Sequence, residues 1–141
     1  MSMNILPHVS VTDGACRSTQ NLSSALWELY APNGELVILQ GICPGRTTNN
    51  VVEHSLVVKL LLEAISLGIR ALVVKIDLQL IVLQLNKHYS VRNHNILRMY
   101  LHVRLLERNF YYVTYQHIPR YINTLTDALA NYDLDQHLQH M

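Results

Sequence analysis

One short segment limits the folds open to this chain more than any other feature does. Residues 71–76 (Ala-Leu-Val-Val-Lys-Ile) are apolar apart from one lysine, and they follow a segment with helical periodicity. A run of this length and β-branched character is typical of a strand that is buried on both faces of a parallel sheet. Parallel neighbours must be joined by a crossover, usually a helix, so the segment predicts a layered α/β fold.

Three further strands are predicted before that segment. Residues 8–12 alternate apolar and polar side chains and then meet Asp13-Gly14, a pattern that predicts a strand ending in a turn. Residues 23–30 and 35–42 are separated by Pro32-Asn33-Gly34, and Asn-Gly is a strong signal for a tight hairpin. We therefore expect the chain to open with three antiparallel strands.

Helices and strands alternate over the rest of the chain. Residues 51–67 have apolar side chains at helical spacing, residues 48–50 offer N-cap side chains, and Gly68 ends the segment. The remaining predicted elements are a short helix over residues 78–85, a longer helix over 93–107 with Leu97, Leu101 and Leu105 on one face, a strand over 110–116 and a terminal helix over 123–138. We predict one α/β domain, residues 1–141, with the order βββαβααβα and a five-stranded mixed sheet.

Composition limits the class of protein. The chain has 141 residues, of which half are hydrophobic and 15% are charged, which argues against disorder and fits a single domain. The apolar share is high for a soluble monomer, and a dimer interface or excision from a larger polypeptide would explain the surplus. No apolar run approaches the roughly 18–20 residues that a membrane span needs, so no membrane partner is expected.

Targeting signals and disulfides are not indicated either. The first seven residues have no basic region followed by an apolar one, so no secretory signal is predicted. Cys16 and Cys43 form neither a CxxC pair nor a zinc set, which indicates free thiols. We therefore expect an intracellular, reducing compartment, which would be the cytoplasm, the nucleus or an organelle.

Four acidic residues fall at positions that this fold would bring together. Asp13 follows the first strand and Asp77 follows the fourth, and the carboxyl ends of neighbouring parallel strands lie at one edge of a sheet. Glu53 is expected in the first turn of its helix, and Asp127 in the first turns of the terminal helix. Such a cluster needs cations to offset its repulsion, and Mg²⁺ prefers oxygen ligands. Two ions about 3.5–4 Å apart could stabilise the attacking and leaving oxygens of a phosphoryl displacement.

Each acid also has an ordinary structural role open to it. Asp13 before glycine is a good turn residue, Glu53 would suit the positive end of a helix dipole, and Asp127 could be a solvated surface residue. Asp77 is harder to account for in this way, because it follows an apolar strand and an acid in such surroundings needs a partner. If the four acids do share a site, six acids remain against eleven bases, an excess that suits a phosphate backbone.

Short motifs throughout the chain resemble those of the type 1 ribonuclease H domain, in the retroelement-derived form found in plant polyproteins. The motifs occur in the family's order and cover nearly the whole chain. They are Thr12-Asp13-Gly14-Ala15, Thr47-Thr48-Asn49-Asn50-Val51-Val52-Glu53, Val73-Val74-Lys75-Ile76-Asp77-Leu78-Gln79-Leu80, Leu85-Asn86 with Tyr89, His117-Ile118-Pro119-Arg120, and Asn123 with Asp127-Ala128-Leu129-Ala130-Asn131. Each motif alone is weak, but together, with the expected element between each pair, they are specific.

The resemblance implies an RNase H-like fold and hydrolysis of the RNA strand of RNA–DNA hybrids, with two Mg²⁺ ions that Mn²⁺ can replace. It gives Asp13, Glu53, Asp77 and Asp127 the role of catalytic metal ligands, and His117 a role in proton transfer or product release. The nucleic-acid contacts that it implies are Gly14, Thr48, Asn49, Asn50 and Gln79. The two asparagines among them could bond the 2′-hydroxyls that distinguish RNA from DNA. It also implies a place in a larger retroelement polyprotein.

Departures from the family pattern support two other hypotheses. The family's Asp-Ser-Gln is Asp77-Leu78-Gln79 here, Thr126 stands where a small alanine is usual, and the glycine-rich residues after Asp13-Gly14 are missing. None of these changes removes a metal ligand. The second hypothesis is a catalytically impaired, repurposed domain that binds nucleic acid or a protein. The third is a structural module whose acids form salt bridges and whose apolar surplus forms a dimer.

Overall fold

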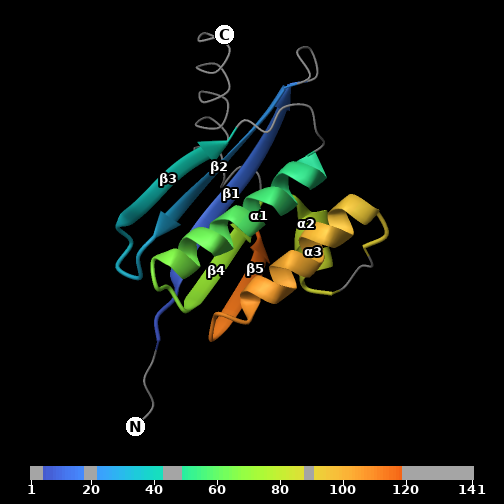
Figure 1. Cartoon of the computed structure of the whole chain (residues 1–141). Coiled ribbons are helices and arrows are strands. Elements are labelled where there is room, and N and C mark those ends of the chain that lie inside the picture. The colour runs from blue at the N-terminus through green and yellow to red at the C-terminus, as the bar shows by residue number, and fades with distance from the viewer. Residues whose placement is uncertain (1–4, 18–21, 43–48, 88–90, 119–141) are drawn as a thin grey trace.

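The computed structural model of the chain describes residues 5–17, 22–42, 49–87 and 91–118, where five strands form one sheet with three helices packed on it (Figure 1). The strands are β1 (His8–Arg17), β2 (Leu22–Tyr30), β3 (Leu36–Ile42), β4 (Ala71–Ile76) and β5 (Tyr112–His117). The helices are α1 (Asn49–Ser66), α2 (Gln79–Leu85) and α3 (His94–Glu107). No helix in these ranges is both long and apolar enough to cross a membrane.

The sheet is mixed and has the strand order β3-β2-β1-β4-β5. β2 pairs antiparallel with both β1 and β3, whereas β4 pairs parallel with both β1 and β5. The prediction of an α/β fold with an antiparallel start and a parallel β4 is therefore confirmed over the described elements. The terminal helix predicted over residues 123–138 lies outside the described residues.

The core lies between the sheet and α1. On α1, Leu56, Leu60 and Ala64 are spaced four residues apart and are fully buried. They share one hydrophobic cluster with Leu72 and Val74 of β4. Full burial of each leucine or valine side chain stabilises the fold by about 1.5–3 kcal/mol. This layer holds α1 across the sheet and so fixes where its polar residues lie.

β1 is longer than its sequence pattern indicates. The prediction ended the strand at Thr12 with a turn at Asp13-Gly14, but β1 continues to Arg17. The cause is its antiparallel partner, because β2 pairs with β1 from Val9 all the way to Arg17. Asp13 therefore lies within a strand, and the prediction of a turn at this position is wrong.

α1 begins at Asn49, two residues earlier than predicted. Glu53 is therefore the fifth residue of the helix, and the first turn contains no acidic residue. The prediction of a first-turn position for Glu53 is wrong. A helix-dipole role for Glu53 fails with it, since that interaction fades beyond the first turn.

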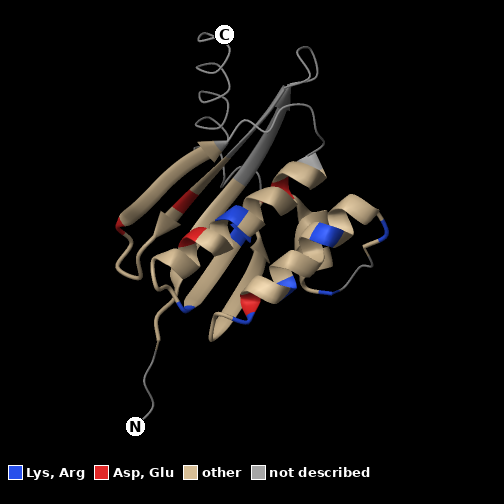
Figure 2. Cartoon of the chain, viewed as in Figure 1, with Lys and Arg blue, Asp and Glu red and all other residues tan. Residues whose placement is uncertain are grey.

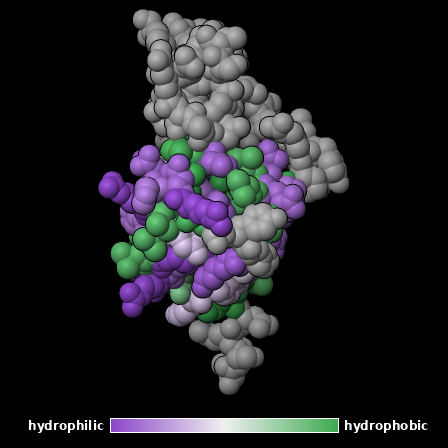
Figure 3. Space-filling view, turned by 90° about the vertical axis from the view of Figure 1, so that its right-hand side faces the viewer, coloured by the Kyte–Doolittle hydropathy of each residue, from purple (hydrophilic) through white to green (hydrophobic). Residues whose placement is uncertain are grey.

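α3 packs against α1, but not through the face that carries its regularly spaced leucines. Its buried residues are Ile96 and Val103, whereas Leu101 and Leu105 are 56% and 58% exposed. The two leucines share a face, as predicted, and that face points to solvent. On the right-hand side of the molecule in Figure 1, hydrophobic and hydrophilic residues are interspersed over the surface (Figure 3).

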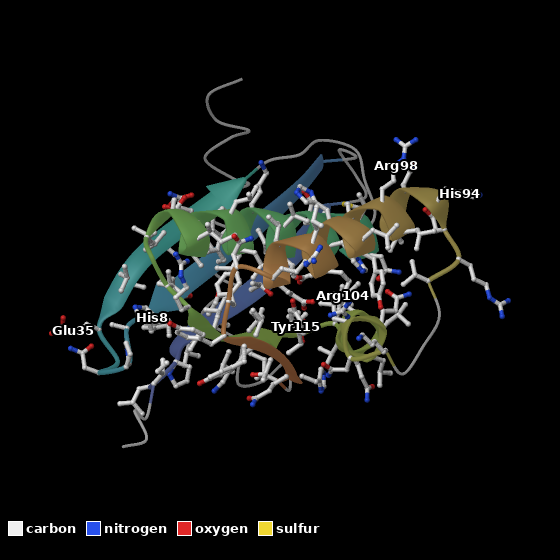
Figure 4. The ribbon with its side chains drawn as sticks, turned by 60° about the horizontal axis from the view of Figure 1, so that its bottom comes forward. His8, Glu35, His94, Arg98, Arg104 and Tyr115 are labelled. Carbon is white, nitrogen blue, oxygen red and sulfur yellow. The ribbon has the colours of Figure 1, made fainter. Side chains whose placement is uncertain are left out.

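A polar network, which we call the α3–β5 clamp, holds β5 against α2 and α3. Arg104 donates from Nη1 to both carboxylate oxygens of Glu107 at 2.8 Å, and from Nη2 to the Leu85 carbonyl oxygen at the end of α2. The Tyr115 hydroxyl donates to Glu107 at 2.6 Å, and the Asn86 side chain donates to the Tyr115 carbonyl oxygen at 3.1 Å. Figure 4 labels Arg104 and Tyr115 in the region where these elements meet. Burial and the nearby Glu107 carboxylate raise the pKa of Tyr115, so its hydroxyl keeps the proton that it donates.

Candidate active site

Two of the predicted metal ligands follow the last pair between the two central parallel strands. The pairing of β1 with β4 ends at Thr12↔Ile76. The next residue along each chain segment is an acid, Asp13 on β1 and Asp77 after β4. The last pair between β4 and β5 is Ile76↔His117, so His117 lies at the same edge of the sheet. The backbone register thus brings together three of the five residues that were predicted to be catalytic.

A fourth, Glu53, reaches this edge from α1. Its side chain is fully buried, and its Oε2 accepts a hydrogen bond of 3.3 Å from the hydroxyl of Thr12, which is also fully buried. Thr12 directly precedes Asp13, so the carboxylate of Glu53 lies beside the end of the β1–β4 pairing. Burying a carboxylate without such partners is costly, so this position requires hydrogen bonds or a cation.

The four-acid metal site is only partly covered by the described residues. Asp127 lies outside them, and of Asp13 only the backbone is described. Among the described residues, no group of three or more His, Cys, Asp or Glu side chains is placed to hold a metal ion. Glu53 and Asp77 are described in full, and they supply carboxylate oxygens, which is the donor chemistry that Mg²⁺ takes. The complete ligand set stays a prediction.

The residues predicted to contact nucleic acid fall into two groups. Gly14 follows Asp13 on β1, and Gln79 is the exposed first residue of α2, two residues after Asp77. Asn49 and Asn50 open α1, about one turn before Glu53. Thr48 lies outside the described residues. The described members therefore lie within a few residues of Asp13, Glu53 and Asp77 along the chain.

Basic residues do not form a single patch over the described part of the chain. Lys and Arg are spread over α1, α3 and the connecting segments (Figure 2). Arg98 and His94 extend outward from the first half of α3 (Figure 4). Over the described residues, the basic excess that was expected on the rest of the surface is therefore spread over several elements.

Sequence reasoning missed His54, the neighbour of Glu53. His54 is fully buried, its Nδ1 lies 2.9 Å from the Asn50 carbonyl oxygen, and its Nε2 has no hydrogen-bond partner among the described residues. Burial lowers the pKa of His54, and the hydrogen bond with Asn50 opposes this in part. Folding therefore favours the neutral imidazole. In the sequence, His54 is a single histidine within a helical segment. Its burial could be inferred only from the apolar residues at neighbouring helix positions, and these do not identify a function for it.

The sheet order, the three described helices and the position of Asp13 and Asp77 directly after the last β1–β4 pair are those of a ribonuclease H-type domain. A family model described as reverse transcriptase-like matches residues 11–133, and the chain belongs to this family. The resemblance found in the sequence motifs is thus confirmed at the level of family and fold.

Ribonuclease HI of Halobacterium salinarum is 31% identical over 123 residues, which are 87% of this chain and 62% of that protein. A crystal structure of RNase H1 from the same organism has a TM-score of 0.85 at 29% identity, and covers 92% of this chain and 98% of that one. The N-terminal RNase H domain of Rv2228c from Mycobacterium tuberculosis has a TM-score of 0.86 at 26% identity, with coverage of 96% and 99%.

Two further comparisons define the extent of the likeness. LC11-RNase H1, solved in complex with an RNA/DNA hybrid, shares the fold with a TM-score of 0.84 at 23% identity, and covers 93% of this chain and 99% of that one. This chain is also 34% identical, over 91 residues, to the full-length bifunctional protein Rv2228c. This chain spans 25% of the length of that protein and matches it over 64% of its own length.

Proposed function

We propose that this chain is an endonuclease that hydrolyses the RNA strand of RNA–DNA hybrids with two Mg²⁺ ions. The main observation behind the proposal is the arrangement at the sheet edge. Asp13 and Asp77 follow the last β1–β4 pair there, and the buried Glu53 accepts a hydrogen bond from Thr12. Family membership and a relative named ribonuclease HI support the reaction class. LC11-RNase H1, which has the same fold and binds an RNA/DNA hybrid, supports the substrate class.

Asp13, Glu53, Asp77 and Asp127 would hold the two ions, for which Mn²⁺ could substitute. When bound, the ions would activate the attacking water and stabilise the leaving 3′-oxygen. The hydrogen bond from Thr12 and the full burial of Glu53 would help to orient this carboxylate. A ligand that is oriented in advance loses less freedom when a metal binds.

His117 would move protons at the same edge. It is exposed at the end of β5, and its strand partner Ile76 directly precedes Asp77. An exposed imidazole near the reacting phosphate can exchange protons with solvent and pass one to a product oxygen. His117 would thus assist product release and would not ligate a metal.

Polar groups around the acids would position the hybrid. The backbone of Gly14 and the exposed side-chain amide of Gln79 would bond phosphate oxygens next to Asp13 and Asp77. Asn49, Asn50 and Thr48 would contact the RNA strand near the amino end of α1. An amide side chain both donates and accepts hydrogen bonds, so it suits a 2′-hydroxyl, which does the same.

We also propose an intracellular, reducing setting and a place within a larger retroelement-type polyprotein. The absence of a CxxC pair in the sequence supports the first, and the reverse transcriptase-like family description supports the second. Expression of the chain with and without flanking reverse transcriptase sequence, followed by comparison of hybrid cleavage, would test the second point.

The direct test is cleavage of an end-labelled RNA–DNA hybrid in Mg²⁺ or Mn²⁺. The wild type should release RNA fragments, and Asp77→Asn should be at least roughly a hundredfold slower, because a ligand of the ions is lost. Glu35→Gln, which removes an exposed acid at the hairpin far from this edge, should cleave like the wild type. An inactive wild type would contradict the proposal, and equal cleavage by wild type and Asp77→Asn would mean that another nuclease is responsible.

A second candidate is a domain that binds hybrid without cutting it. One observation favours it: Leu78, which replaces the family's serine, is the N-cap of α2 and makes no side-chain capping hydrogen bond. The helix beside Asp77 therefore begins without the side-chain cap that a serine could supply. Fluorescence anisotropy with a labelled hybrid distinguishes the two candidate functions. The binding-only domain should bind the hybrid equally well with and without Asp77→Asn, and should not cleave it.

A further inference from the structure

Asn86 joins the end of α2 to β5. It is the C-cap of α2, and its backbone N–H donates to the Val82 carbonyl oxygen at 2.9 Å. Its side-chain Nδ2 donates to the carbonyl oxygen of Tyr115 at 3.1 Å. Leu85-Asn86 is one of the family motifs in the sequence, yet the resemblance assigns it neither a metal nor a nucleic-acid contact. The hydrogen bond to Tyr115 indicates a role of another kind.

The carbonyl group that Asn86 binds lies on the outer side of β5. This strand pairs with β4, and no described strand lies on its other side. The Ile118 N–H donates to the Ile76 carbonyl oxygen at 3.0 Å, so the backbone groups of Ile118 face β4. Backbone groups of successive residues in a strand point to alternate sides, so those of Tyr115 face outward. Asn86 therefore supplies a donor that a neighbouring strand would otherwise supply.

These two hydrogen bonds lie on either side of His117 along the chain. Tyr115 precedes it by two residues and is held from the outer side by Asn86. Ile118 follows it directly and is held from the inner side by Ile76, the residue before Asp77. The imidazole of His117 is itself exposed. Its position relative to Asp77 therefore depends on how firmly the backbone is held at these two points.

The α3–β5 clamp in turn anchors Asn86. Arg104 donates from Nη2 to the carbonyl oxygen of Leu85, the residue directly before Asn86. Arg104 also bonds Glu107, which accepts a hydrogen bond from the Tyr115 hydroxyl. The clamp is thus a closed ring of hydrogen bonds. Within this ring Asn86 bonds the backbone of β5, whereas the Tyr115 hydroxyl bonds α3, so removal of the Asn86 amide acts most directly on the end of β5.

We propose that Asn86 is a positioning residue for the reaction, which fixes the end of β5 through the Tyr115 carbonyl group and so places His117 beside Asp77. The inference rests on the proposed nuclease function and on the proton-transfer role of His117. Asn86 touches no reacting group, so its effect on the reaction passes through His117. Displacement of a reacting group by about 1 Å can lower a rate by about a hundredfold, so even a small shift of β5 is measurable.

The first test is the kinetics of hybrid cleavage in Mg²⁺. Asn86→Ala should lower kcat by about tenfold and leave KM unchanged, because the amide orients a catalytic group and does not bind the hybrid. Asn86→Asp, which keeps the shape and cannot donate when ionised, should behave alike. The control is Asn109→Ala, which removes an amide donor to the Leu106 carbonyl oxygen at 3.1 Å, beyond the end of α3, and should leave kcat unchanged.

A double-mutant cycle separates positioning from a merely structural role. In a His117→Ala background, Asn86→Ala should have no further effect on kcat, because both changes act through the same group. A loss of the same factor in both backgrounds, or no loss in either, would overturn the inference and leave the nuclease proposal intact. A wild type that does not cleave the hybrid would contradict both.

Nuclear magnetic resonance of the protein without metal or hybrid gives a readout that is independent of activity. Asn86→Ala should shift the amide resonances of His117 and Ile118 and speed the hydrogen exchange of the Ile118 amide, which is bonded to Ile76. Asn109→Ala should do neither. An Ile118 amide that exchanges equally fast in Asn86→Ala and the wild type would also overturn the inference.

Discussion

At the scale of single residues, Thr12 tests how the buried Glu53 is held. Thr12→Val keeps the shape of the side chain and removes the donor to Glu53. We expect the free energy of unfolding to fall by about 1–3 kcal/mol, because a buried carboxylate loses a hydrogen bond. Thr12→Ser keeps the hydroxyl and serves as the control. Urea unfolding in EDTA measures both, and a Thr12→Val variant as stable as the wild type would show that this hydrogen bond contributes nothing.

His54 gives a pH prediction with a definite sign. Burial lowers its pKa in the folded state below the ordinary value of 6.5, so folding favours the neutral imidazole. Above pH 6.5 both folded and unfolded forms are neutral. As the pH falls below 6.5, the unfolded chain takes up the proton first and the folded state loses stability.

The His54→Leu variant isolates this effect. It should remove part of the loss of stability between about pH 6.5 and 5, since leucine fills the buried space without titrating. His94→Leu, at an exposed position on α3, is the control. Denaturant unfolding at several pH values measures the effect, and an unchanged pH slope in His54→Leu would contradict the assignment.

Single residues differ in how readily the sequence reveals them. Asp77 stands out in the sequence as a candidate because an acid directly after an apolar strand is costly to bury unless a cation or a hydrogen-bond donor accompanies it. His54 was not, because its burial depends on how α1 packs against other elements, which the local pattern does not contain. Glu53 was identified as a site residue, but its predicted position in the helix was wrong because the start of α1 could not be fixed among three acceptable caps.

At the scale of elements, the α3–β5 clamp joins the ends of α2 and α3 to β5. Tyr115→Phe should lower the free energy of unfolding by about 1–3 kcal/mol, because it removes a hydrogen bond to a carboxylate. Tyr112→Phe is the matched control, since Tyr112 is exposed and its hydroxyl makes only a 3.4 Å contact with the Ile5 carbonyl oxygen. Thermal or urea unfolding compares them, and equal losses would mean that the clamp does not stabilise β5.

Elements were predictable where a pattern is local. The Asn33-Gly34 turn and the apolar β4 fixed the hairpin and the parallel strand correctly. The length of β1 is not determined by the local sequence, because its continuation past Asp13 depends on pairing with β2. The local sequence does not determine the orientation of α3 either, since the face with Leu101 and Leu105 is apolar yet points to solvent.

At the scale of the whole molecule, the sequence order of elements was enough to predict the mixed sheet and the meeting of strand ends. The place of Asp127 relative to the other acids stays a prediction, because this residue lies outside the described part of the chain. Part of the surplus of apolar residues noted in the composition is exposed in the structure, for example at Leu36, Val37 and Leu39 of β3 and at Leu101 and Leu105 of α3.

Clustered acids predict that metal and stability are coupled. In EDTA, Asp77→Asn should be more stable than the wild type by about 1 kcal/mol, because one charge of a repelling group is removed. Mg²⁺ should raise the melting temperature of the wild type by binding the folded state, and should raise that of Asp77→Asn less. Glu35→Gln should respond to Mg²⁺ like the wild type. A variant that is less stable than wild type in EDTA would contradict the clustering.

The central claim is that Asp13, Glu53, Asp77 and Asp127 together hold two ions. The most direct measurement is anomalous scattering from crystals of the protein soaked in Mn²⁺. We predict two manganese peaks about 3.5–4 Å apart, with oxygens of these four carboxylates around them. A soaked crystal with no manganese among these residues, or with the ions bound elsewhere, would contradict the account.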